Sequence, residues 1–399
     1  MNVKVKIPTG LIDVITSSIE LDWRLSSLKE KQIQKIIKRL VELWYFIYDK
    51  QITNSDVENL KFYVDVNVND FRRFDIMVNS IRLTYKDLLF ILNNAIECNG
   101  KYSSGNFSMG YRVKTDFLKF TKLTEFEIDF NKVFNKTKNK EYWVDKYPSL
   151  HNLIEDCYNA SIDLDEYLFW MLNNVGMKLN PIYCKKTHRL KDRYLTEETI
   201  YYHFNLALKV NLKNIWFKLS NEGRLYSSIS NLPKGAVNFI KLYGLDTSSI
   251  DISNCQPLIL STMVSNEDYK SDCMNGLFYD NMVQNLWGDL SLRSKFKTLS
   301  YKLIFFGSNG LKSGAVYECM EKLYKGLIHE INTIKEDRCL AKELQEKESN
   351  IFVKGIGKIK MFKLLRHDEV IVIKGNEEKV KEYLRMEFSK LKIKNLKFS

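Results

Sequence analysis

Glycine and proline are scarce in this chain, which has 17 glycines and 5 prolines among 399 residues. That scarcity argues against long flexible linkers, collagen-like repeats and glycine-rich sandwich folds. The seven cysteines are scattered, with no CxxC pair and no Cys/His set at zinc-ligand spacing. No run of about 18 apolar residues occurs, and the N-terminus lacks the apolar core of a signal peptide. We therefore expect a protein with reduced thiols and no membrane span, in the cytoplasm of a bacterial or phage-infected cell.

Positive charge is in excess, because 61 Lys and Arg residues stand against 49 Asp and Glu, for a net charge of +12. A basic surface favours polyanionic partners, since each phosphate that it neutralises releases counterions. Many basic proteins bind no nucleic acid, so this signal needs support from motifs. Apolar residues form 45% of the chain and aromatic residues 13%, enough for a sizeable core in two or three domains.

The two halves of the chain differ in their predicted secondary structure. Residues 1–215 read as mostly helical, and apolar residues recur at helical spacing over 28–48, 84–97, 162–175 and 197–210. Segment 99–113 is predicted to form a hairpin or wing. From Leu219 onward, short strands are predicted at 249–252, 358–365 and 370–374, between helices at 257–286, 289–306, 315–334, 337–353 and 377–391. The second half is therefore α+β, with a small antiparallel sheet covered by helices on one side.

Two aspartates fall at the ends of predicted strands, Asp251 and Asp368. A mixed sheet can bring two such ends side by side. Nucleotidyl transfer uses metal ions about 3.5–4 Å apart, and hard oxygen ligands hold them. Two aspartates on rigid strands suffice, because water and substrate phosphates complete the coordination. Taken alone, each aspartate is better explained as a turn former that caps a strand or helix.

A predicted helix carries Arg293, Lys297, Tyr301 and Phe305 at four-residue steps. This spacing places the two cations and then the two aromatic rings along one face. Such a face can bind a triphosphate through the cations and stack a base or sugar on the rings. The alternative is an ordinary amphipathic helix with solvated cations and buried aromatic residues, which is favoured when the helix is considered alone.

Three motifs together resemble those of family A nucleotide polymerases, the group of DNA polymerase I and the phage-type RNA polymerases. The segment 251–256 (DISNCQ) is similar to the first motif of the family, and residues 293–305 are similar to the second. His367-Asp368-Glu369, followed by Val-Ile-Val, resembles the third motif. Two flanking segments also match, at 223–228 (GRLYSS) and around Gln345, and all five occur in the family's order over residues 220–380.

The resemblance implies a role for each matching residue. Asp251 and Asp368 would bind two Mg²⁺ ions, with Mn²⁺ as an alternative, and Glu369 would lie beside them in a supporting role. The incoming nucleoside triphosphate would be contacted by Arg293, Lys297, Tyr301, Phe305 and Gln256. The primer-template would be contacted by Arg224, Gln345 and His367, although a packed histidine at a strand end explains His367 equally well.

This chain departs from the family pattern at two places. The DNA enzymes of the family carry a glutamate that helps to exclude the 2′-hydroxyl, where this chain has Gln256. Phe306 and Gly307 follow Phe305 in place of the family's Tyr-Gly pair, and the distance between the second and third motifs is short. The two residue changes point to modest fidelity, and the short spacing implies reduced fingers. The acidic string at 163–166 (DLDE) is better explained as the first turn of a helix than as nuclease ligands.

The sequence as a whole predicts an α+β right-hand polymerase, with a palm built on a small antiparallel sheet, helical fingers and a helical thumb. The expected parts are a helical N-terminal domain (1–135), thumb-like helices (136–218), palm (219–286), fingers (287–335) and palm (336–399). The predicted function is template-directed DNA polymerisation without a proofreading exonuclease. Two alternatives stay open: an RNA polymerase or primase-like enzyme on the same scaffold, and a non-catalytic nucleic-acid-binding protein.

Overall fold

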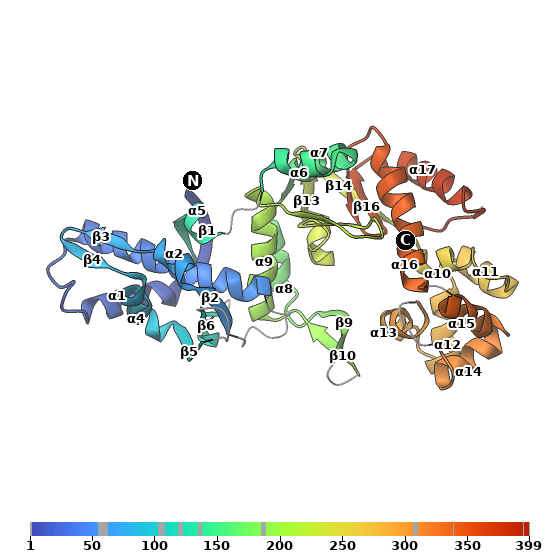
Figure 1. The fold of residues 1–399 in the computed structure, drawn as a ribbon, viewed down its shortest axis with the longest axis horizontal. Helices are drawn as coiled ribbons and strands as arrows, with labels where there is room; N and C mark the ends of the chain where they lie inside the picture. The colour runs from blue at the N-terminus through green and yellow to red at the C-terminus, as the bar shows by residue number, and fades with distance from the viewer. Residues whose placement is uncertain are drawn as a thin grey trace. The chain divides into compact units, whose positions relative to one another are not determined.

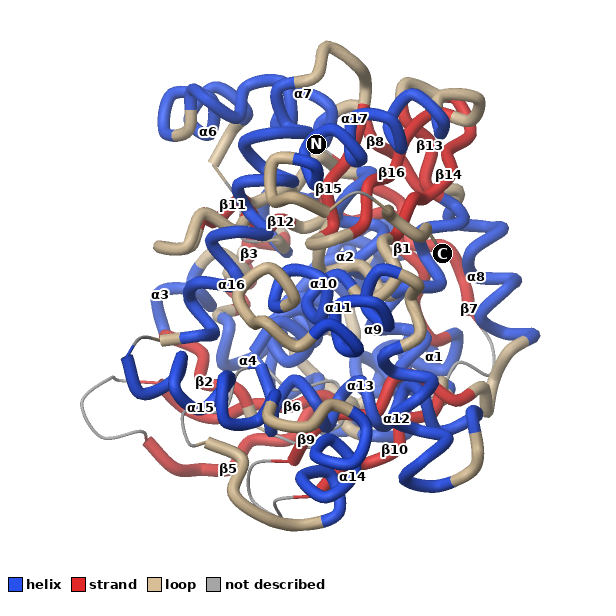
Figure 2. The backbone as a smooth tube through the Cα atoms, turned by 90° about the vertical axis from the view of Figure 1, so that its right-hand side faces the viewer, coloured by secondary structure: helices blue, strands red, loops and turns tan. Residues whose placement is uncertain are grey.

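The computed structural model describes residues 2–54, 63–102, 108–118, 123–134, 138–184, 189–305, 310–337, 339–393 and 395–398 (Figures 1 and 2). The chain divides into two compact units. The first comprises Met1–Thr137, Met171–Val175 and Leu195–Asn205, and the second comprises Lys138–Trp170, Gly176–Tyr194 and Leu206–Ser399. Among the helices in these ranges, none has the length and apolar character needed to cross a bilayer.

The first unit mixes helices and strands. Its helices are α1 (Thr9–Glu20), α2 (Glu30–Asn54), α3 (Val68–Arg72), α4 (Tyr85–Ile91) and α5 (Phe130–Val133), with 3₁₀ turns η1 (Leu92–Asn94) and η2 (Thr115–Leu118). Its strands are β1 (Asn2–Pro8), β2 (Val64–Asn67), β3 (Ile76–Val78), β4 (Ile81–Leu83), β5 (Ile96–Tyr102), β6 (Ser108–Val113) and β7 (Leu123–Asp129). They pair antiparallel as β1–β7, β3–β4 and β2–β6–β5. The N-terminal region is thus a mixed structure, which corrects the prediction of a mostly helical one.

Helix α2 forms the centre of the first unit and confirms the helix predicted at 28–48. Trp44 and Tyr48 are fully buried, and their rings stack 5.5 Å apart. The buried Gln51 side chain accepts a hydrogen bond from the N–H of Val113, at 2.8 Å, and so connects α2 to the end of β6. Burial of large apolar surface stabilises the helix, and the amide satisfies a backbone donor that would otherwise be left unpaired.

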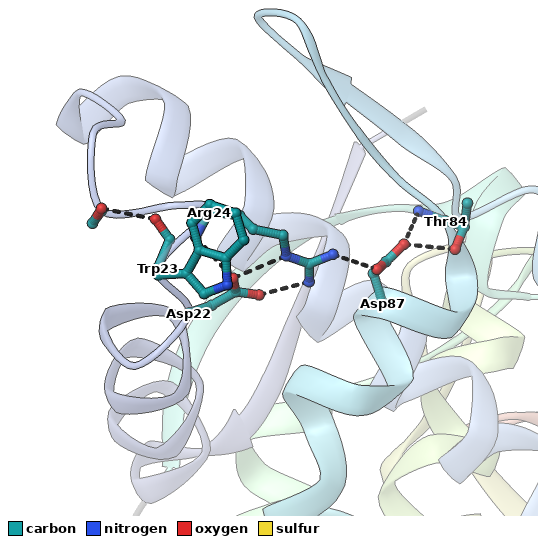
Figure 3. A network of polar contacts seen from close by, with 6 residues as sticks. Asp22, Trp23, Arg24, Thr84 and Asp87 are labelled. Atoms are coloured by element: carbon teal, nitrogen blue, oxygen red, sulfur yellow. Dashed lines mark hydrogen bonds and ion pairs between the residues drawn. The ribbon is translucent and has the colours of Figure 1, made fainter.

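The turn between α1 and α2 is held by an ion-pair network (Figure 3). The Arg24 guanidinium donates to Asp22 at 3.0 and 2.7 Å and to Asp87 of α4 at 2.7 Å. Asp87 also accepts from the N–H and hydroxyl of Thr84, at 2.8 and 2.7 Å, immediately before α4 begins. Partial burial opposes ionisation of Asp87, but the bonds from Arg24 and Thr84 outweigh it and lower the pKa to about 2.

The second unit contains most of the remaining elements. Its helices and helical turns are α6 (Lys140–Lys146), η3 (Pro148–Leu150), α7 (His151–Tyr158), η4 (Lys234–Phe239), α10 (Cys255–Leu260), α11 (Glu267–Met274), α12 (Phe278–Trp287), η5 (Leu290–Leu292), α13 (Arg293–Ser300), η6 (Tyr301–Phe305), α14 (Ala315–Leu323), α15 (Leu327–Asp337), α16 (Leu340–Ser349), η7 (Asn350–Gly355), η8 (Ile356–Lys358) and α17 (Glu377–Ser389). Its strands are β8 (Ala160–Ile162), β9 (Lys178–Cys184), β10 (Arg189–Tyr194), β11 (Phe217–Leu219), β12 (Leu225–Ser227), β13 (Ile240–Leu242), β14 (Leu245–Asp251), β15 (Lys363–Arg366) and β16 (Glu369–Ile373). Helices α8 (Leu164–Asn173) and α9 (Glu197–Asn211) have residues in both units.

A five-stranded sheet organises the second unit, in the order β15–β16–β14–β13–β8 with antiparallel neighbours throughout. Strand β16 is mostly apolar and buried, and Val370 and Ile371 have no exposed surface. Strand β14 is largely polar, and Ile250 is its buried residue. Helix α17 packs against β14, and α7 packs against β15 (Figure 1). The predicted small antiparallel sheet is therefore confirmed. Strand β8 belongs to it, although its segment is predicted as part of a helical thumb.

Helices α11, α12 and α13 and the residue after α14 share a core of aromatic rings. Phe278 lies at its centre, with ring centroids 5.3 Å from Tyr269, 6.0 Å from Tyr324 and 6.3 Å from Phe296. The helix predicted at 257–286 is broken into α10, α11 and α12, and the one at 315–334 ends and restarts near Gly326, where φ is 82°. A left-handed residue cannot continue an α-helix, and glycine adopts that conformation at little cost.

Candidate active site

The register of β14 against β16 brings the predicted carboxylates together. Asp251, the last residue of β14, lies opposite Glu369, the first residue of β16. Facing residues of an antiparallel pair have Cα atoms about 4.5–5.5 Å apart. Asp368 immediately precedes Glu369, so the backbone positions of Asp251 and Asp368 lie at the same end of β14 and β16. The predicted meeting of two strand ends is present in the structure.

A two-residue turn fixes Asp368. Strand β15 ends at Arg366, which pairs with Glu369, so only His367 and Asp368 lie between the strands. His367 has φ 60°, the left-handed conformation that tight hairpin turns of this length require. Its ring lies edge-on to Tyr226, with centroids 5.5 Å apart. Burial lowers the pKa of His367, and the nearby Arg224 cation lowers it further.

Glu369 forms an ion pair with Arg366. The Arg366 guanidinium donates to its carboxylate at 2.9 Å and to the carbonyl oxygen of Leu232 at 2.8 Å. Glu369 is only 8% exposed, so its geometry is compatible with the supporting position that the resemblance implies.

Several charged residues of the site affect the pKa of Cys255, the first residue of α10. Burial raises the pKa of its thiol, and the carboxylates of Asp368 and Asp251 raise it further, while the Lys297 ammonium lowers it. Electrostatic effects of this kind require proximity. Both aspartates and the lysine of α13 are therefore close enough to Cys255 to affect its thiol.

Arg293 begins α13 at the edge of this cluster. Its Nε donates to the Asp280 carboxylate at 2.7 Å, and its Nη2 donates to the Asn254 side chain at 3.3 Å. The guanidinium also lies 5.4 Å from the Tyr279 ring. Arg293 is thus near the expected place but paired with a carboxylate. Lys297, one turn further along, has no ion-pair partner among the described residues.

The predicted four-residue spacing from Arg293 to Phe305 is not kept on one helical face at its aromatic end. After Ser300 the helix widens into a π-helical turn, η6, which carries Tyr301 to Phe305. Tyr301 stays near the site, since the charges of Asp368 and Glu348 contribute to raising its pKa after burial, the largest cause. Phe305 has no exposed surface and contacts Phe278 in the aromatic core. This corrects the expectation that Phe305 stacks on a nucleotide, because the π turn rotates its side chain inward. Phe306 and Gly307 lie outside the described residues.

Glu348, near the end of α16, is the site residue that the sequence did not reveal. It is 2% exposed, accepts from the Arg224 guanidinium at 2.6 Å and accepts from the Gln256 side-chain amide. Burial raises the pKa of Glu348 to about 7 against the opposing effect of Arg224, and the Asp368 charge adds to the rise. This carboxylate therefore joins Arg224 and Gln256, two predicted substrate-contacting residues, and lies within electrostatic range of Asp368.

The orientation of the Gln256 amide follows from that contact. A carboxylate only accepts, so the NH₂ group of Gln256 faces Glu348 and its oxygen points away. That oxygen is buried without a hydrogen-bond partner among the described residues. Gln345 lies one turn before Glu348 on α16 and is half-buried. A cavity of about 10 Å³, room for about one water, adjoins Arg224, Glu348 and His367.

A divalent cation at this site would depend on only two protein carboxylates. Within the ranges that the structure describes, no group of three or more His, Cys, Asp and Glu side chains is arranged as a metal site. Paired aspartates at a strand end and a neighbouring turn nevertheless fit Mg²⁺, which retains several waters and takes substrate phosphate oxygens as further ligands. The donor set is therefore suited to ions that bind together with a nucleotide.

No protein-family model and no curated protein matches the sequence. A solved structure with a similar chain path is the POL domain of Pol1 from M. smegmatis, in complex with DNA primer-template and dNTP. The two chains are 13% identical and superpose with a TM-score of 0.41, over 63% of this chain and 68% of the other.

Proposed function

We propose that this chain is a template-directed DNA polymerase of the family A type, which transfers nucleotides from deoxynucleoside triphosphates to a primer 3′ end. The observation that carries the proposal is the β14–β16 register. It pairs Asp251 with Glu369, the residue after Asp368, and the charges of Asp251, Asp368 and Lys297 all shift the pKa of the buried Cys255 thiol. Two carboxylates facing a cationic helix are the parts that nucleotidyl transfer requires.

In this proposal Asp251 and Asp368 hold the metal ions. Bound there, two Mg²⁺ ions would activate the primer 3′ oxygen and stabilise the leaving pyrophosphate. The 3′ oxygen forms the new bond to the α-phosphorus as the bond to pyrophosphate breaks. Lys297 and Arg293 contact the triphosphate, and Tyr301 borders the base or sugar. Gln345, Arg224 and His367 contact the primer-template, with Arg224 held in position by the buried Glu348 carboxylate.

Primer extension tests the proposal directly. A labelled primer-template is incubated with Mg²⁺ and deoxynucleotides, and wild type is compared with Asp251→Asn and Asp368→Asn. We expect each substitution to reduce incorporation by at least about a hundredfold, equivalent to about 3 kcal/mol of transition-state stabilisation. Asp246→Asn is the matched control, because Asp246 lies at the other end of β14 and pairs with Lys241 and Lys374 on the surface.

The outcomes separate this function from its alternatives. Incorporation that is equal in wild type and both site variants would exclude the polymerase assignment. Preferred incorporation of ribonucleotides would assign the scaffold to RNA synthesis instead. Salt-sensitive binding of the primer-template with no metal-dependent turnover would identify a non-catalytic binding protein.

A further inference from the structure

A basic groove lies along α17, away from the carboxylate site. It has a volume of about 660 Å³, and lysines from three segments line it: Lys354, Lys358, Lys360 and Lys390. Tyr383 and Met386 of α17 form its apolar wall and are 39% and 48% exposed. Below, these six residues are called the α17 groove.

The groove and the active site lie on different faces of the same segment. Along η7, Phe352 and Val353 are buried and border the small cavity beside Arg224. Lys354 is exposed and faces the groove instead. Residues that differ by one or two positions in a helical turn point to different sides. A ligand in the α17 groove would therefore not occupy the carboxylate site.

The charge of the groove is largely uncompensated. Among the described residues that line it, Glu387 is the one carboxylate, and Lys390 donates to it at 2.5 Å. Lys354, Lys358 and Lys360 are exposed and have no ion-pair partner in the part of the chain that the structure describes. Three unpaired ammonium groups in one concave surface favour an anionic ligand, because a concave wall concentrates the field.

The apolar wall indicates which anion fits. Tyr383 and Met386 are three positions apart on α17, so they lie on the same helical face and make one continuous surface. An acidic peptide would use the lysines but would gain little from an exposed aromatic ring. A single-stranded nucleic acid uses both, since its phosphates pair with lysines while its bases stack on aromatic rings. An unpaired strand can turn a base toward an exposed ring, whereas a duplex keeps its bases stacked inside.

We propose that the α17 groove is a second nucleic-acid site, which binds a single strand through its phosphates at Lys354, Lys358 and Lys360 and one base on Tyr383. This site lies outside the proposed primer-template contacts and does not require polymerase activity. It would hold single-stranded nucleic acid that is not engaged at the carboxylates.

Binding of a fluorescein-labelled twelve-nucleotide oligo(dT) strand tests the inference, followed by fluorescence anisotropy over a range of salt concentrations. The test variant is Lys354→Gln/Lys358→Gln/Lys360→Gln. The matched control is Lys29→Gln/Lys31→Gln/Lys35→Gln, three exposed lysines at the start of α2 in the other compact unit. Both variants lose the same charge. We expect the groove variant alone to lower the salt slope by about two, since each phosphate contact in a single strand contributes about 0.7.

The aromatic contact is tested separately at Tyr383. Tyr383→Ala should weaken binding about tenfold through loss of one stacked base, whereas Tyr383→Phe keeps the ring and should stay within about twofold of wild type. Because Tyr383 is exposed, neither change disturbs the core. If Tyr383→Ala and Tyr383→Phe weaken binding equally, the stacking part of the proposal is wrong. If the two triple-lysine variants lose the same salt slope, the phosphate part is wrong.

Two further measurements locate the strand. Competition with polyglutamate of the same charge should be weak, and competition equal to that of unlabelled oligo(dT) would assign the groove to acidic peptides and refute the proposal. The titration is repeated with Asp251→Asn protein saturated with primer-template. Oligo(dT) should still bind to this saturated, inactive protein. Failure of the groove proposal and failure of the polymerase proposal can therefore be distinguished. Displacement of oligo(dT) by the primer-template would refute a separate site.

Discussion

The buried carboxylate of Glu348 gives the sharpest test of the site's electrostatics, through the substitution Glu348→Gln. The side chain is 2% exposed and accepts bonds from Arg224 and Gln256. Burial raises its pKa from 4.5 to about 7. A glutamine of the same size retains most contacts but cannot ionise. The pH dependence of stability that belongs to Glu348 should therefore vanish in the variant.

Proton linkage gives the direction in which the stability changes with pH. Between pH 4.5 and about 7 the folded protein keeps the Glu348 proton, whereas the unfolded chain releases it. The contribution to stability is therefore fully present below about pH 4.5, falls as the pH rises toward 7, and levels off above. The difference between the two pKa values corresponds to about 3 kcal/mol, of which about 2.5 kcal/mol is lost between pH 5 and 8.

Urea unfolding at pH 5, 6, 7 and 8, with a chelator present to exclude divalent ions, measures this loss. We expect the free energy of unfolding of wild type to fall by about 2.5 kcal/mol more across this range than that of Glu348→Gln. Glu346→Gln, at an exposed position on the same helix, is the control and should follow wild type. Parallel pH profiles for wild type and Glu348→Gln would refute the reasoning, whatever the absolute stability of the variant.

Three further predictions concern other parts of the chain. Gly235→Ala should destabilise the protein by about 1–3 kcal/mol in urea unfolding, because a Cβ there would lie 2.4 Å from the Trp170 ring; Gly10→Ala, in open space within α1, should be neutral or slightly stabilising. Lys297→Ala should raise KM for the nucleotide about tenfold or more, a loss of about 1.4 kcal/mol, and leave the affinity for primer-template unchanged in a binding assay. Asp87→Asn should cost about 1–2 kcal/mol at pH 7, and wild type should lose that advantage between pH 3.8 and about 2, as the carboxylate held by Arg24 becomes protonated.

The central strands and their two aspartates are predictable because their signals are local. The segment that forms β16 is a short apolar run after Glu369, and β14, although mostly polar, ends in the alternating Ser249-Ile250-Asp251 stretch. Once both join one antiparallel sheet, the meeting of Asp251 and Asp368 requires only the correct register. β1 carries a comparable local signal, since Val3, Val5 and Ile7 alternate with lysines and all three are buried. Period-two alternation of this kind predicts a strand, not a helix.

Glu348 was not predictable, because its surroundings in the sequence resemble a solvated helix. It follows Glu346 and Lys347 in a charged stretch, and its burial depends on Arg224 and Gln256, which are 124 and 92 residues away. The π turns are equally hidden, since no residue pattern distinguishes 301–305 from a regular helix. Tertiary packing decides both features, and both lie at the site, where local rules fail most often.

Pairing of Arg293 with Asp280 is compatible with a role for this cation in binding a triphosphate. The two side chains are 40% and 35% exposed, and pairs with this much solvent contact contribute about 0–1 kcal/mol. Exchange of one carboxylate for two or three phosphate oxygens would therefore cost little and would gain charge-assisted hydrogen bonds of about twice the usual strength. Asp280 and the Asn254 side chain are the partners of the guanidinium in this structure. Lys297 needs no such exchange, so its substitution should affect nucleotide binding more directly than substitution of Arg293.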